Sequence, residues 1–434
     1  MLKIAVLGLG VGYALACCLA EAGYETIGVD IAPKMVADPR KDASVQKLSR
    51  NKAVHRRIEK NLTLTTDYSS IVGAHFVINC VSTGDEKKLV LGHVEGATRQ
   101  ALRELRNSTA KQPPILMVYS TLPFGSSQAL RKLFEEEHVE IDKKVGYVHF
   151  PLMIAQGTTA DDFVNPPFVV FGSYDPRSAK RAMVFYRNFL RKSKLYTGRL
   201  PPMYLGTPEE AELSKLAANA YLTTKIAVAN EIGTLCEKLN IDGQKIMQTV
   251  GSDWRIGRKF TRPGFAVGGA CFPRDLKSLI ETFQTAQVDP QILGAVDRSN
   301  NLRKLDPLDK IEGSNVIVLG TSYKSGVSIE SGSPALDLIE HLRSNGFSVK
   351  GFDPKFEDPS LMEAMFHDQD TVIVTIAEDA FREIGKKLDG RVKVVLDYAG
   401  IVDGTLLPSQ VAFWQAGRGW VQSAGKAGSL TKQT

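Results

Sequence analysis

The sequence predicts an α/β protein in which two Rossmann-like, doubly wound domains are joined by a helical middle domain with a long central helix. Three observations support this prediction. The chain opens with a strand, a glycine-rich turn, a helix and a second strand that ends in an acid, over residues 3–30. A second strand followed by a glycine-containing turn begins near residue 315. Between these segments, residues 207–239 have an unbroken helical pattern, about 50 Å long at 1.5 Å per residue.

The composition is that of an ordinary folded protein. Hydrophobic residues make up 43% and charged residues 24% of the 434 positions, and this length predicts two or three domains. No run reaches the roughly 18 apolar residues of a membrane span, so we expect no membrane association. The apolar start from Met1 to Gly8 lacks a basic leader and runs into a glycine turn, so we interpret it as a buried strand rather than a signal peptide.

Charge and cysteine content narrow the function classes. The net charge of +6 is modest, and the Lys and Arg residues are scattered among acids. This pattern predicts no nucleic-acid partner, whereas an anionic small ligand suits it. The cysteines are odd in number and lack the paired spacing of a metal site: Cys17, Cys18, Cys80, Cys236 and Cys271. We therefore expect reduced thiols in a cytoplasmic protein with no metal.

The first nucleotide-binding signature is the turn Gly8-Leu9-Gly10-Val11-Gly12. Its glycines allow a tight turn and a close approach of a pyrophosphate to the N-terminus of the next helix. Asp30 ends the second strand, where a carboxylate binds a pair of ribose hydroxyls. Because this charge repels a 2′-phosphate, the pattern favours NAD over NADP. The third glycine comes one residue early, since Tyr13 stands where the pattern has glycine.

Further strands are predicted over residues 76–81, 115–119 and 145–148. Ser82-Thr83 and Ser120-Thr121 follow the first two of these strands, at the ends where open α/β sheets bind ligands. The same hydroxyls are equally typical of caps on helices and turns. The residues alone leave both interpretations open.

The middle segment begins after Pro201-Pro202, which we interpret as a linker. Residues 207–210 predict a capping box that opens the long helix. Lys215 and Asn219 are four residues apart and share one face of this helix. They are either a solvated polar pair or site residues, and a Lys on a long helix usually points to water. A helix of this length spans domains or packs against a partner subunit.

One thiol stands in the glycine-rich segment from Gly268 to Asp275. Glycines let a backbone approach a ligand closely, and Pro273 stiffens the turn. Arg274 and Asp275 supply charge that can favour a thiolate or position a proton. Cys271 is therefore either a nucleophile with a polar partner or a small buried hydrophobic residue.

The last third of the chain predicts a second doubly wound unit. Its strands are expected over residues 315–320, 348–352, 371–375 and 392–396, with a helix over 334–342. The first strand leads to a turn that contains Lys324, and the second ends at Asp353. The final ten or so residues, rich in Gly, Ser and Lys, are expected to form a frayed tail.

Together these motifs resemble the UDP-glucose/GDP-mannose dehydrogenase family. The resemblance covers nearly the whole chain in the right order, through residues 212–219, 230–231, 253–257, 268–275, 318–324 and 333–334. The long helix and the Cys-Phe-Pro-Arg-Asp loop are most similar to the UDP-glucose 6-dehydrogenase branch. With the family in view, Cys271 is predicted to be the nucleophile.

The resemblance implies oxidation of the C6 alcohol of a UDP-sugar, such as UDP-glucose, to a carboxylate with two NAD, through a thiohemiacetal and a thioester on Cys271. The implied catalytic residues are Cys271, Lys215, Asn219, Asp275 and Thr121. The residues implied to bind NAD are Gly8, Gly10, Val11, Gly12, Asp30, Lys34, Ser82, Thr83 and Thr121. Those implied to bind the substrate are Lys215, Asn219, Arg255, Phe265, Gly268 and Lys324.

The resemblance also implies a division of the chain into segments. Residues 1–200 would form the NAD-binding domain, and residues 201–305 a helical central and dimerisation domain with the Cys loop. Residues 306–425 would bind the nucleotide sugar, and residues 426–434 would be a tail. The long helix would form the core of a homodimer or a higher homo-oligomer.

The sequence departs from the family pattern at several positions. Leu152 and Gln156 stand where the family has glutamates, and Ser331 stands where it has an arginine. The first glutamate is the family's usual acid/base group, and leucine can neither accept a proton nor bind water. Three hypotheses follow: a nucleotide-sugar 6-dehydrogenase in which Asp275 and water replace this glutamate, a two-electron dehydrogenase on another nucleotide or nucleoside, and a catalytically inactive nucleotide-binding paralogue.

Overall fold

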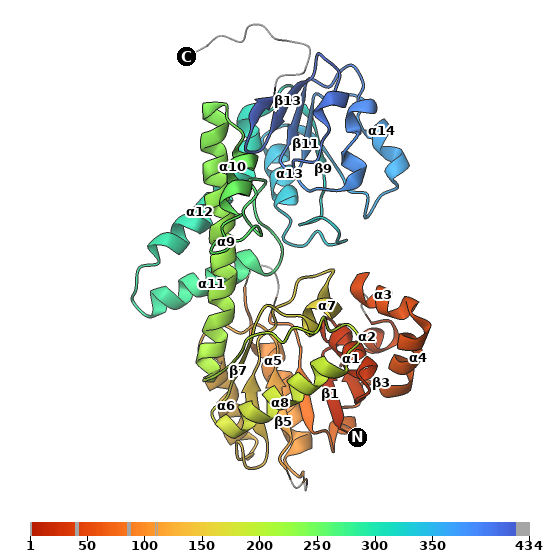
Figure 1. The fold of residues 1–434 in the computed structure, drawn as a ribbon, viewed down its shortest axis with the longest axis vertical. Coiled ribbons are helices and arrows are strands. Elements are labelled where there is room, and N and C mark those ends of the chain that lie inside the picture. The colour runs from red at the N-terminus through yellow and green to blue at the C-terminus, as the bar shows by residue number, and fades with distance from the viewer. Residues whose placement is uncertain (1, 40–42, 85–87, 109, 111, 422–434) are drawn as a thin grey trace. The chain divides into compact units, whose positions relative to one another are not determined.

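The computed structural model describes residues 2–39, 43–84, 88–108, 110 and 112–421 (Figure 1). The chain divides into two compact units, Met1–Ala218 and Asn219–Thr434. Each unit contains one mostly parallel sheet, and a long helix runs through the middle of the sequence, which confirms the predicted fold class. Within the described residues, no helix is both long and apolar enough to cross a membrane. The tail predicted over residues 426–434 lies outside the described part of the chain.

The first unit contains an eight-stranded sheet in the order β3-β2-β1-β4-β5-β6-β7-β8, parallel except between β6 and β7. Its strands are β1 (Lys3–Leu7), β2 (Glu25–Val29), β3 (Leu62–Thr65), β4 (Phe76–Asn79), β5 (Ile115–Val118), β6 (Gly146–His149), β7 (Val169–Gly172) and β8 (Met203–Gly206). Its helices include α1 (Gly12–Glu21), α2 (Pro33–Ala37), α3 (Ala43–Arg50), α4 (Lys52–Asn61), α5 (Gly92–Leu105), α6 (Ser126–Glu136), α7 (Thr159–Val164) and α8 (Pro176–Lys192).

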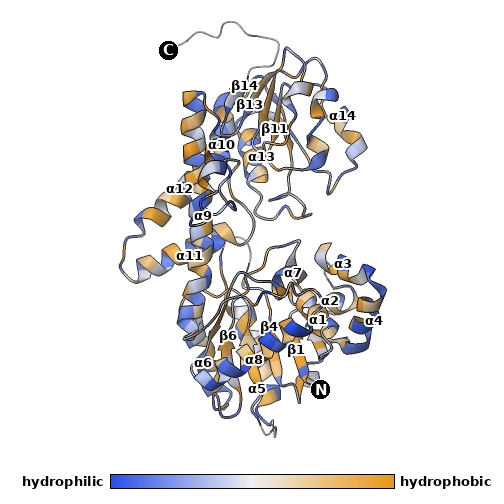
Figure 2. Ribbon diagram, viewed as in Figure 1, coloured by the Kyte–Doolittle hydropathy of each residue, from blue (hydrophilic) through white to orange (hydrophobic). Residues whose placement is uncertain are grey.

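Two apolar clusters cover the two faces of this sheet. On one face the strands pack against α1, α3, α4, α7 and α8, and on the other against α5 and α6. The strands at the centre of each unit are among its most hydrophobic segments (Figure 2). Nearly every residue of α1 is buried, because the helix lies between the sheet and its neighbours α4 and α7. This packing fixes the helix that begins at the glycine turn.

The second unit contains a six-stranded sheet in the order β10-β9-β11-β12-β13-β14, in which only the β13–β14 pair is antiparallel among the described strands. Its strands are β9 (Asn315–Leu319), β10 (Ser348–Phe352), β11 (Thr371–Val374), β12 (Val394–Asp397), β13 (Ala412–Gln415) and β14 (Gly419–Val421). Its helices include α10 (Gly243–Val250), α11 (Phe272–Thr285), α12 (Gln291–Leu305), α13 (Pro334–Ser344) and α14 (Met362–Met365).

The long helix α9 spans Pro208–Leu239, as predicted. Its capping box forms in both directions: the Thr207 amide donates to Glu210 Oε2 over 2.7 Å, and the Glu210 amide donates to Thr207 Oγ1 over 3.2 Å. The interpretation of Pro201-Pro202 as a linker is wrong. The carbonyl of Pro202 accepts the amide of Val169, and the chain continues directly into β8, the edge strand of the first sheet.

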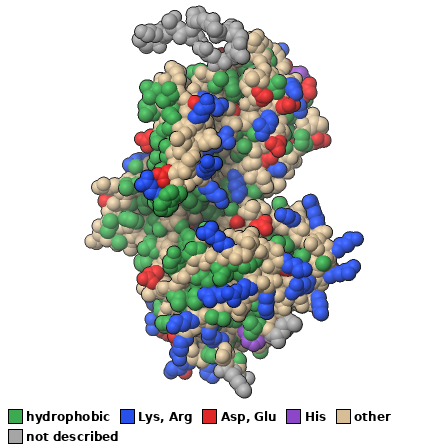
Figure 3. Space-filling view, viewed as in Figure 1, with side chains coloured by type: hydrophobic (Ala, Val, Ile, Leu, Met, Phe, Trp, Pro, Cys, Tyr) green, Lys and Arg blue, Asp and Glu red, His purple; other side chains and the backbone are tan. Residues whose placement is uncertain are grey.

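The positive charge is less scattered than expected. Helix α8 contains six Lys and Arg residues and no acid. On the face of the first unit shown in Figure 3, Lys and Arg side chains gather over α8 and over α3 and α4. The basic side chains are therefore concentrated on helices that cover one face of the first sheet.

Candidate active site

The glycine turn after β1 is closed by the acid that follows β2. Gly8 has a φ of +83°, and its amide donates to the carbonyl of Val29 over 2.8 Å. Asp30 Oδ2 accepts the amide of Leu9 over 2.7 Å, and Oδ1 accepts the amide of Ala32 over 2.9 Å. A carboxylate has about four lone-pair sites, so Asp30 keeps capacity for ribose hydroxyls while it holds the turn.

The glycines of the turn have different roles. A Cβ at Gly10 would meet no atom within 4 Å, so the backbone there faces open space that a pyrophosphate can occupy. A Cβ at Gly12 would lie 3.0 Å from both Cys80 Cβ and Val6 Cγ1, so this glycine lets α1 pack closely on the strands. Gly12 thus takes the close-packing role of the third glycine one residue early. Tyr13 is a partly buried side chain packed on the core, and burial raises its pKa.

Four strand ends place the predicted NAD-binding residues at one edge of the first sheet. The last residues of β1, β2, β4 and β5 are in register, with Leu7 opposite both Val29 and Asn79, and Asn79 opposite Val118. Parallel strands in register bring the following loops together. These loops carry the glycine turn, Asp30, Ser82, Thr83 and Thr121.

Hydroxyl groups tie these loops to one another. Ser120 Oγ donates to the carbonyl of Val81 over 2.5 Å, which joins the loops after β4 and β5. Ser82 Oγ donates to Gly84 within its own loop over 3.0 Å, and Thr83 is buried. Lys34 is exposed on α2, just after Asp30. The edge therefore combines an open glycine turn, a carboxylate and ordered loops, and its residues fit an NAD molecule.

Leu152 lies beside this edge. It follows β6, and its amide donates to the carbonyl of Tyr119 over 3.0 Å, so it is adjacent to the loop that carries Thr121. Its side chain packs on the apolar core. Gln156 is half-buried in the following loop, where Asp162 accepts the amide of Ala155 over 2.8 Å and the hydroxyl of Thr158 over 2.7 Å. The structure therefore places an apolar side chain where the family pattern has an acid/base group.

The second unit brings Asn219, Asp275 and the Cys loop together. Asp275 is fully buried in the first turn of α11. Its Oδ2 accepts Asn219 Nδ2 over 2.6 Å, and its Oδ1 accepts Arg274 Nε over 3.2 Å and Nη2 over 3.0 Å. Both carboxylate oxygens therefore have partners, and the orientation of the Asn219 amide is fixed. The buried contact with Arg274 is a feature that charge counting from the sequence did not reveal.

Cys271 is the N-cap residue of α11 and is exposed. The N-terminus of a helix favours negative charge, which suits a thiolate. The alternative of a buried hydrophobic residue is therefore wrong for Cys271, whereas Cys17, Cys18, Cys80 and Cys236 are buried. Lys215 and Asn219 are also buried, so the alternative of a solvated surface pair on α9 is wrong as well.

Glycines pack the Cys loop against the turn before α13. The Gly269 amide donates to the carbonyl of Gly332 over 2.9 Å. A Cβ at Gly268 would lie 2.3 Å from Pro334 Cδ, and a Cβ at Gly269 would lie 2.5 Å from the ring of Tyr323. Only glycine fits these close approaches. The loop that ends in Cys271 is therefore locked to the segment that contains Ser331 and to the turn that contains Lys324.

The loop that precedes the Cys loop is held by side chains from two helices, α9 and α12. Lys225 Nζ on α9 donates to the carbonyls of Ile256 over 2.8 Å and Lys259 over 2.7 Å. Asn230 Oδ1 accepts the amide of Gly264 over 2.8 Å. On α12, Asn300 makes two hydrogen bonds to the backbone of Val267, and Arg303 Nε donates to Gly264. Lys225, Asn300 and Arg303 are not among the predicted site residues. Polar side chains within a helix that also has apolar faces are a signal that they bind the backbone of a neighbouring loop.

Two predicted substrate residues lie on this loop. Arg255 is exposed and pairs with Asp253, with 2.6 Å between Nη2 and Oδ2. Phe265 packs edge-on against Tyr398, with 5.2 Å between ring centroids. Both are in the second unit with Cys271.

The turn after β9 repeats the arrangement of the turn after β1. Gly320 has a φ of +96°, and its amide donates to the carbonyl of Phe352 over 2.7 Å. Asp353 accepts the amides of Ser322 over 2.7 Å and Lys355 over 2.9 Å. Asp353 is fully buried, unlike the partly exposed Asp30, so only the first turn offers its carboxylate to a ligand. Lys324 lies in this second turn, with its Nζ 5.6 Å from the centroid of the Tyr323 ring.

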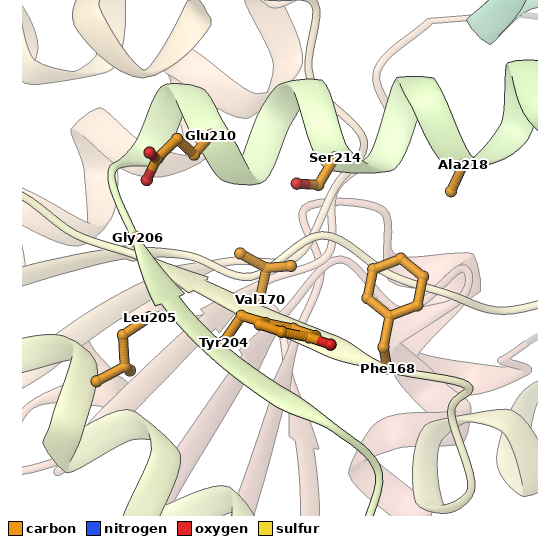
Figure 4. A pocket seen from close by; sticks show the side chains of 8 residues that line it. All are labelled: Phe168, Val170, Tyr204, Leu205, Gly206, Glu210, Ser214 and Ala218. Atoms are coloured by element: carbon orange, nitrogen blue, oxygen red, sulfur yellow. The ribbon is translucent and has the colours of Figure 1, made fainter.

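A cavity of about 580 Å³ lies at the edge of the first sheet. Figure 4 shows its lining from β7, β8 and the start of α9: Phe168, Val170, Tyr204, Leu205, Gly206, Glu210, Ser214 and Ala218. None of these is a predicted site residue. The described residues contain no group of three or more His, Cys, Asp or Glu side chains arranged to hold a metal ion.

The fold and the glycine turn define an NAD-dependent dehydrogenase. The chain belongs to the UDP-glucose/GDP-mannose dehydrogenase family, whose domain profiles match along its length. The NAD binding domain matches residues 2–190, the central domain residues 209–302 and the UDP binding domain residues 317–404. These matches confirm the predicted family and the NAD cofactor.

Named relatives in this family differ in substrate. The chain is 28% identical to the UDP-glucose 6-dehydrogenase AglM of Haloferax volcanii over 92% of this chain and 97% of the relative. It is 28% identical to a GDP-mannose 6-dehydrogenase of Pseudomonas aeruginosa over 82% of each chain. Among solved structures, a UDP-glucose dehydrogenase from Pyrobaculum islandicum has a TM-score of 0.78 at 26% identity, covering 92% of this chain and 95% of that one.

Proposed function

We propose that this protein is a nucleotide-sugar 6-dehydrogenase that oxidises the C6 alcohol of a UDP-sugar of the UDP-glucose type to the carboxylate. The observation that supports it best is the exposed thiol of Cys271 at the start of α11. One helical turn further along α11, the buried Asp275 accepts a hydrogen bond from Asn219 of α9. A simple alcohol dehydrogenase has no use for a nucleophile at this position. The overall reaction consumes one alcohol, two NAD and one water, and gives one carboxylate, two NADH and three protons.

NAD bound at the glycine turn supplies the hydride acceptor for both oxidations. The first oxidation gives an aldehyde at C6. The Cys271 thiolate then adds to this carbon and forms a C–S bond, and the carbonyl oxygen becomes an oxyanion that takes a proton. Loss of a hydride from the thiohemiacetal carbon and of the proton from its hydroxyl oxygen gives a thioester. Water finally breaks the C–S bond, which releases the carboxylate and restores the thiol.

The charged and polar residues near α9 supply the electrostatic part of this mechanism. The ammonium of Lys215 and the amide of Asn219 stabilise the oxyanion at C6. Asp275 fixes the rotamer of Asn219 through the 2.6 Å hydrogen bond and takes part in proton transfer to or from water. Thr121 lies at the nicotinamide end of NAD, and Lys324 binds the nucleotide diphosphate. Arg255, Phe265 and Gly268 belong to the loop that surrounds the substrate.

Leu152 favours a second candidate function. With no acid/base group beside the Thr121 loop, no side chain there takes the proton that the thiohemiacetal hydroxyl loses in the second oxidation. If this oxidation does not proceed, the reaction ends after one hydride transfer, at the aldehyde. The experiment measures NADH formed per substrate consumed over a panel of UDP- and GDP-sugars, with the product mass recorded in the same tube. Two NADH and a gain of one oxygen with loss of two hydrogens support the four-electron reaction. One NADH per substrate supports the two-electron alternative, and silence across the panel with NAD binding intact supports an inactive paralogue.

We also propose an oligomeric assembly and a cellular location for this protein. The exposed apolar residues Tyr221, Val228, Leu235 and Leu239 recur on α9 at helical spacing, which suits a homodimer or a larger homo-oligomer built on this helix. None of the five cysteines, all of which lie in the described part of the chain, is in a disulfide, and we propose a cytoplasmic location. Sedimentation of Tyr221→Glu beside the unmodified protein tests the helix interface, since a buried charge there should shift the protein to monomer.

A further inference from the structure

Glu212 is a fully buried carboxylate on the first turns of α9. Its Oε2 accepts the amide of Gly125 over 2.7 Å, and its Oε1 accepts the amide of Ser127 over 2.6 Å. These two amides belong to the N-terminus of α6, whose cap residue Gly125 provides no side-chain cap of its own. Glu212 therefore supplies from α9 the hydrogen bonds that an N-cap side chain normally supplies locally.

The backbone at Gly125 explains why the cap comes from another helix. Gly125 has a φ of +84°, a left-handed conformation that glycine adopts at no steric cost. A carboxylate near the positive end of the α6 dipole is stabilised there. Burial raises the pKa of Glu212, while its hydrogen bonds to the amides lower it. The buried acid thus caps a helix start whose own cap residue, Gly125, has no side chain.

The segment held in this way is the loop that carries Thr121. Residues 119–125 connect β5 to α6. Near its start, the loop is tied to the neighbouring strand end by the hydrogen bond from Ser120 to Val81, and at its end it is tied to Glu212. Between the two ties, Leu122 is buried and Thr121 is partly exposed. Release of the second tie leaves Thr121 attached on one side only.

We propose that Glu212 is a positioning residue that fixes the loop of residues 119–125 and so holds Thr121 at the nicotinamide end of NAD. The inference rests on the proposed function through the place given to Thr121. It does not require turnover, because it concerns only how this chain binds the two ends of a dinucleotide. Glu212 acts through the loop, whereas the glycine turn and Asp30 at the other strand ends serve the adenosine end.

The test compares two ligands, NADH and ADP-ribose, which lacks the nicotinamide. In Glu212→Gln, an amide NH₂ faces one of the two backbone donors, so one charge-assisted hydrogen bond is lost. We expect the affinity for NADH to fall about tenfold, which corresponds to about 1.4 kcal/mol, and the affinity for ADP-ribose to change less than twofold. Binding is measured by titration calorimetry at a temperature well below the melting temperature.

Two control variants separate positioning from stability. Glu209→Gln removes the charge from a contact between the same two helices, in which Glu209 Oε1 accepts Gln128 Nε2 over 3.3 Å, and it should change neither affinity. Glu21→Gln changes another fully buried acid of this unit, which accepts Ser193 Oγ over 2.9 Å. It should lower the melting temperature and leave the ratio of the NADH and ADP-ribose affinities unchanged. If Glu212→Gln weakens NADH and ADP-ribose equally, Glu212 is only a structural cap and the proposal is overturned.

A measurement on the unmodified protein keeps the proposal testable if Glu212→Gln does not fold. NAD should slow hydrogen exchange in the peptide that covers residues 119–127, whereas ADP-ribose should not. Equal protection by both ligands, or by neither, rejects the proposal. If NAD protects this peptide and ADP-ribose does not, but the protein oxidises no nucleotide sugar, the proposed function fails while the role of Glu212 stands.

Discussion

Asn219 donates its side-chain amide to Asp275 over 2.6 Å, and this hydrogen bond joins α9 to the first turn of α11. Arg274 binds the other oxygen of the same carboxylate. The three side chains are all buried, so the hydrogen bonds among them form away from water. The helix start that presents Cys271 is thus fixed to α9 by a polar cluster rather than by apolar packing alone.

Replacement of Asp275 by Asn should break this cluster. Arg274 would then be a buried cation without its carboxylate, and we expect the free energy of unfolding to fall by about 3 kcal/mol. Urea denaturation measures this change. Asp253→Asn is the matched control, because Asp253 also pairs with an arginine but at the surface, and it should leave the urea midpoint unchanged. Equal midpoints for the two variants would contradict the structural importance of the buried pair.

Cys271→Ser should separate binding from chemistry. A serine at the start of α11 keeps the helix N-terminus but cannot form a thioester, so we expect NAD affinity to be retained and carboxylate formation to fall below about 1% of the unmodified rate. Product mass and NAD titration check both parts. Cys236→Ser, at a buried thiol in the same unit, should keep its activity per folded molecule. Near-normal acid production by Cys271→Ser would rule out the covalent mechanism.

Asp30→Ser should change the choice of cofactor. The carboxylate that repels a 2′-phosphate is removed, and a hydrogen-bonding partner of the ribose is lost, so we expect NAD affinity to fall about tenfold and the ratio of NADP to NAD affinity to rise. Titration with both cofactors measures the ratio. Asp353→Ser changes the corresponding acid of the second unit and should leave NAD affinity as it was. An unchanged ratio in Asp30→Ser would argue against ribose binding by this residue.

Leu152→Glu should restore an acid/base group beside the Thr121 loop. If hydrolysis of the thioester limits turnover, we expect its rate to rise about a hundredfold, within the usual range for general acid/base catalysis. Rapid quenching followed by mass spectrometry of Cys271 measures how fast the acylated enzyme disappears. Leu152→Met, which adds no ionisable group, should behave like the unmodified protein. A rate in Leu152→Glu that matches Leu152→Met would show that another residue or water already performs this step.

The ion pairs of Glu137 should make the stability of the folded protein fall at acid pH. Hydrogen bonds from Arg103 and Arg99 lower its pKa from 4.5 to about 2. The folded state therefore keeps this group ionised while the unfolded chain takes up a proton, so its contribution to stability is complete above pH 4.5 and is lost as the pH falls towards 2. Melting temperatures of Glu137→Gln and the unmodified protein should converge over this window. A constant difference between them down to pH 2 would contradict the assignment.

The sequence was sufficient to predict the fold class, the long helix and the glycine turn, because each depends on local spacing. The helix α9 begins at Pro208 because residues 207–210 form the capping box that its sequence predicts. The family departure at Tyr13 also has a local explanation, since Gly12 makes the close contact with Cys80. The strand β8 was missed because it is a short strand at the edge of the sheet that directly follows Pro201-Pro202, and two prolines are more typical of a linker.

Burial was harder to predict than secondary structure. The residues alone left open whether Lys215 and Asn219 lie on a solvated face or in a site, and both are buried. Polar side chains are compatible with the interior only when other groups bind them, and those groups can be distant in the sequence. The bond from Asn219 to Asp275 crosses 56 positions of sequence. The motif that contains these residues placed them in a family, but it did not show which groups they contact.

Gly268, Gly269 and Gly332 leave no room for a Cβ between the Cys loop and the segment before α13. Every other amino acid carries a Cβ, so any missense change in these three codons creates a collision in the same small region. Substitutions in the loop that carries Cys271 and in the turn that carries Lys324 are therefore not independent of one another. A saturation-mutagenesis survey should find these codons among the least tolerant of the gene, and a rare tolerated change at one of them should require a compensating change across the contact.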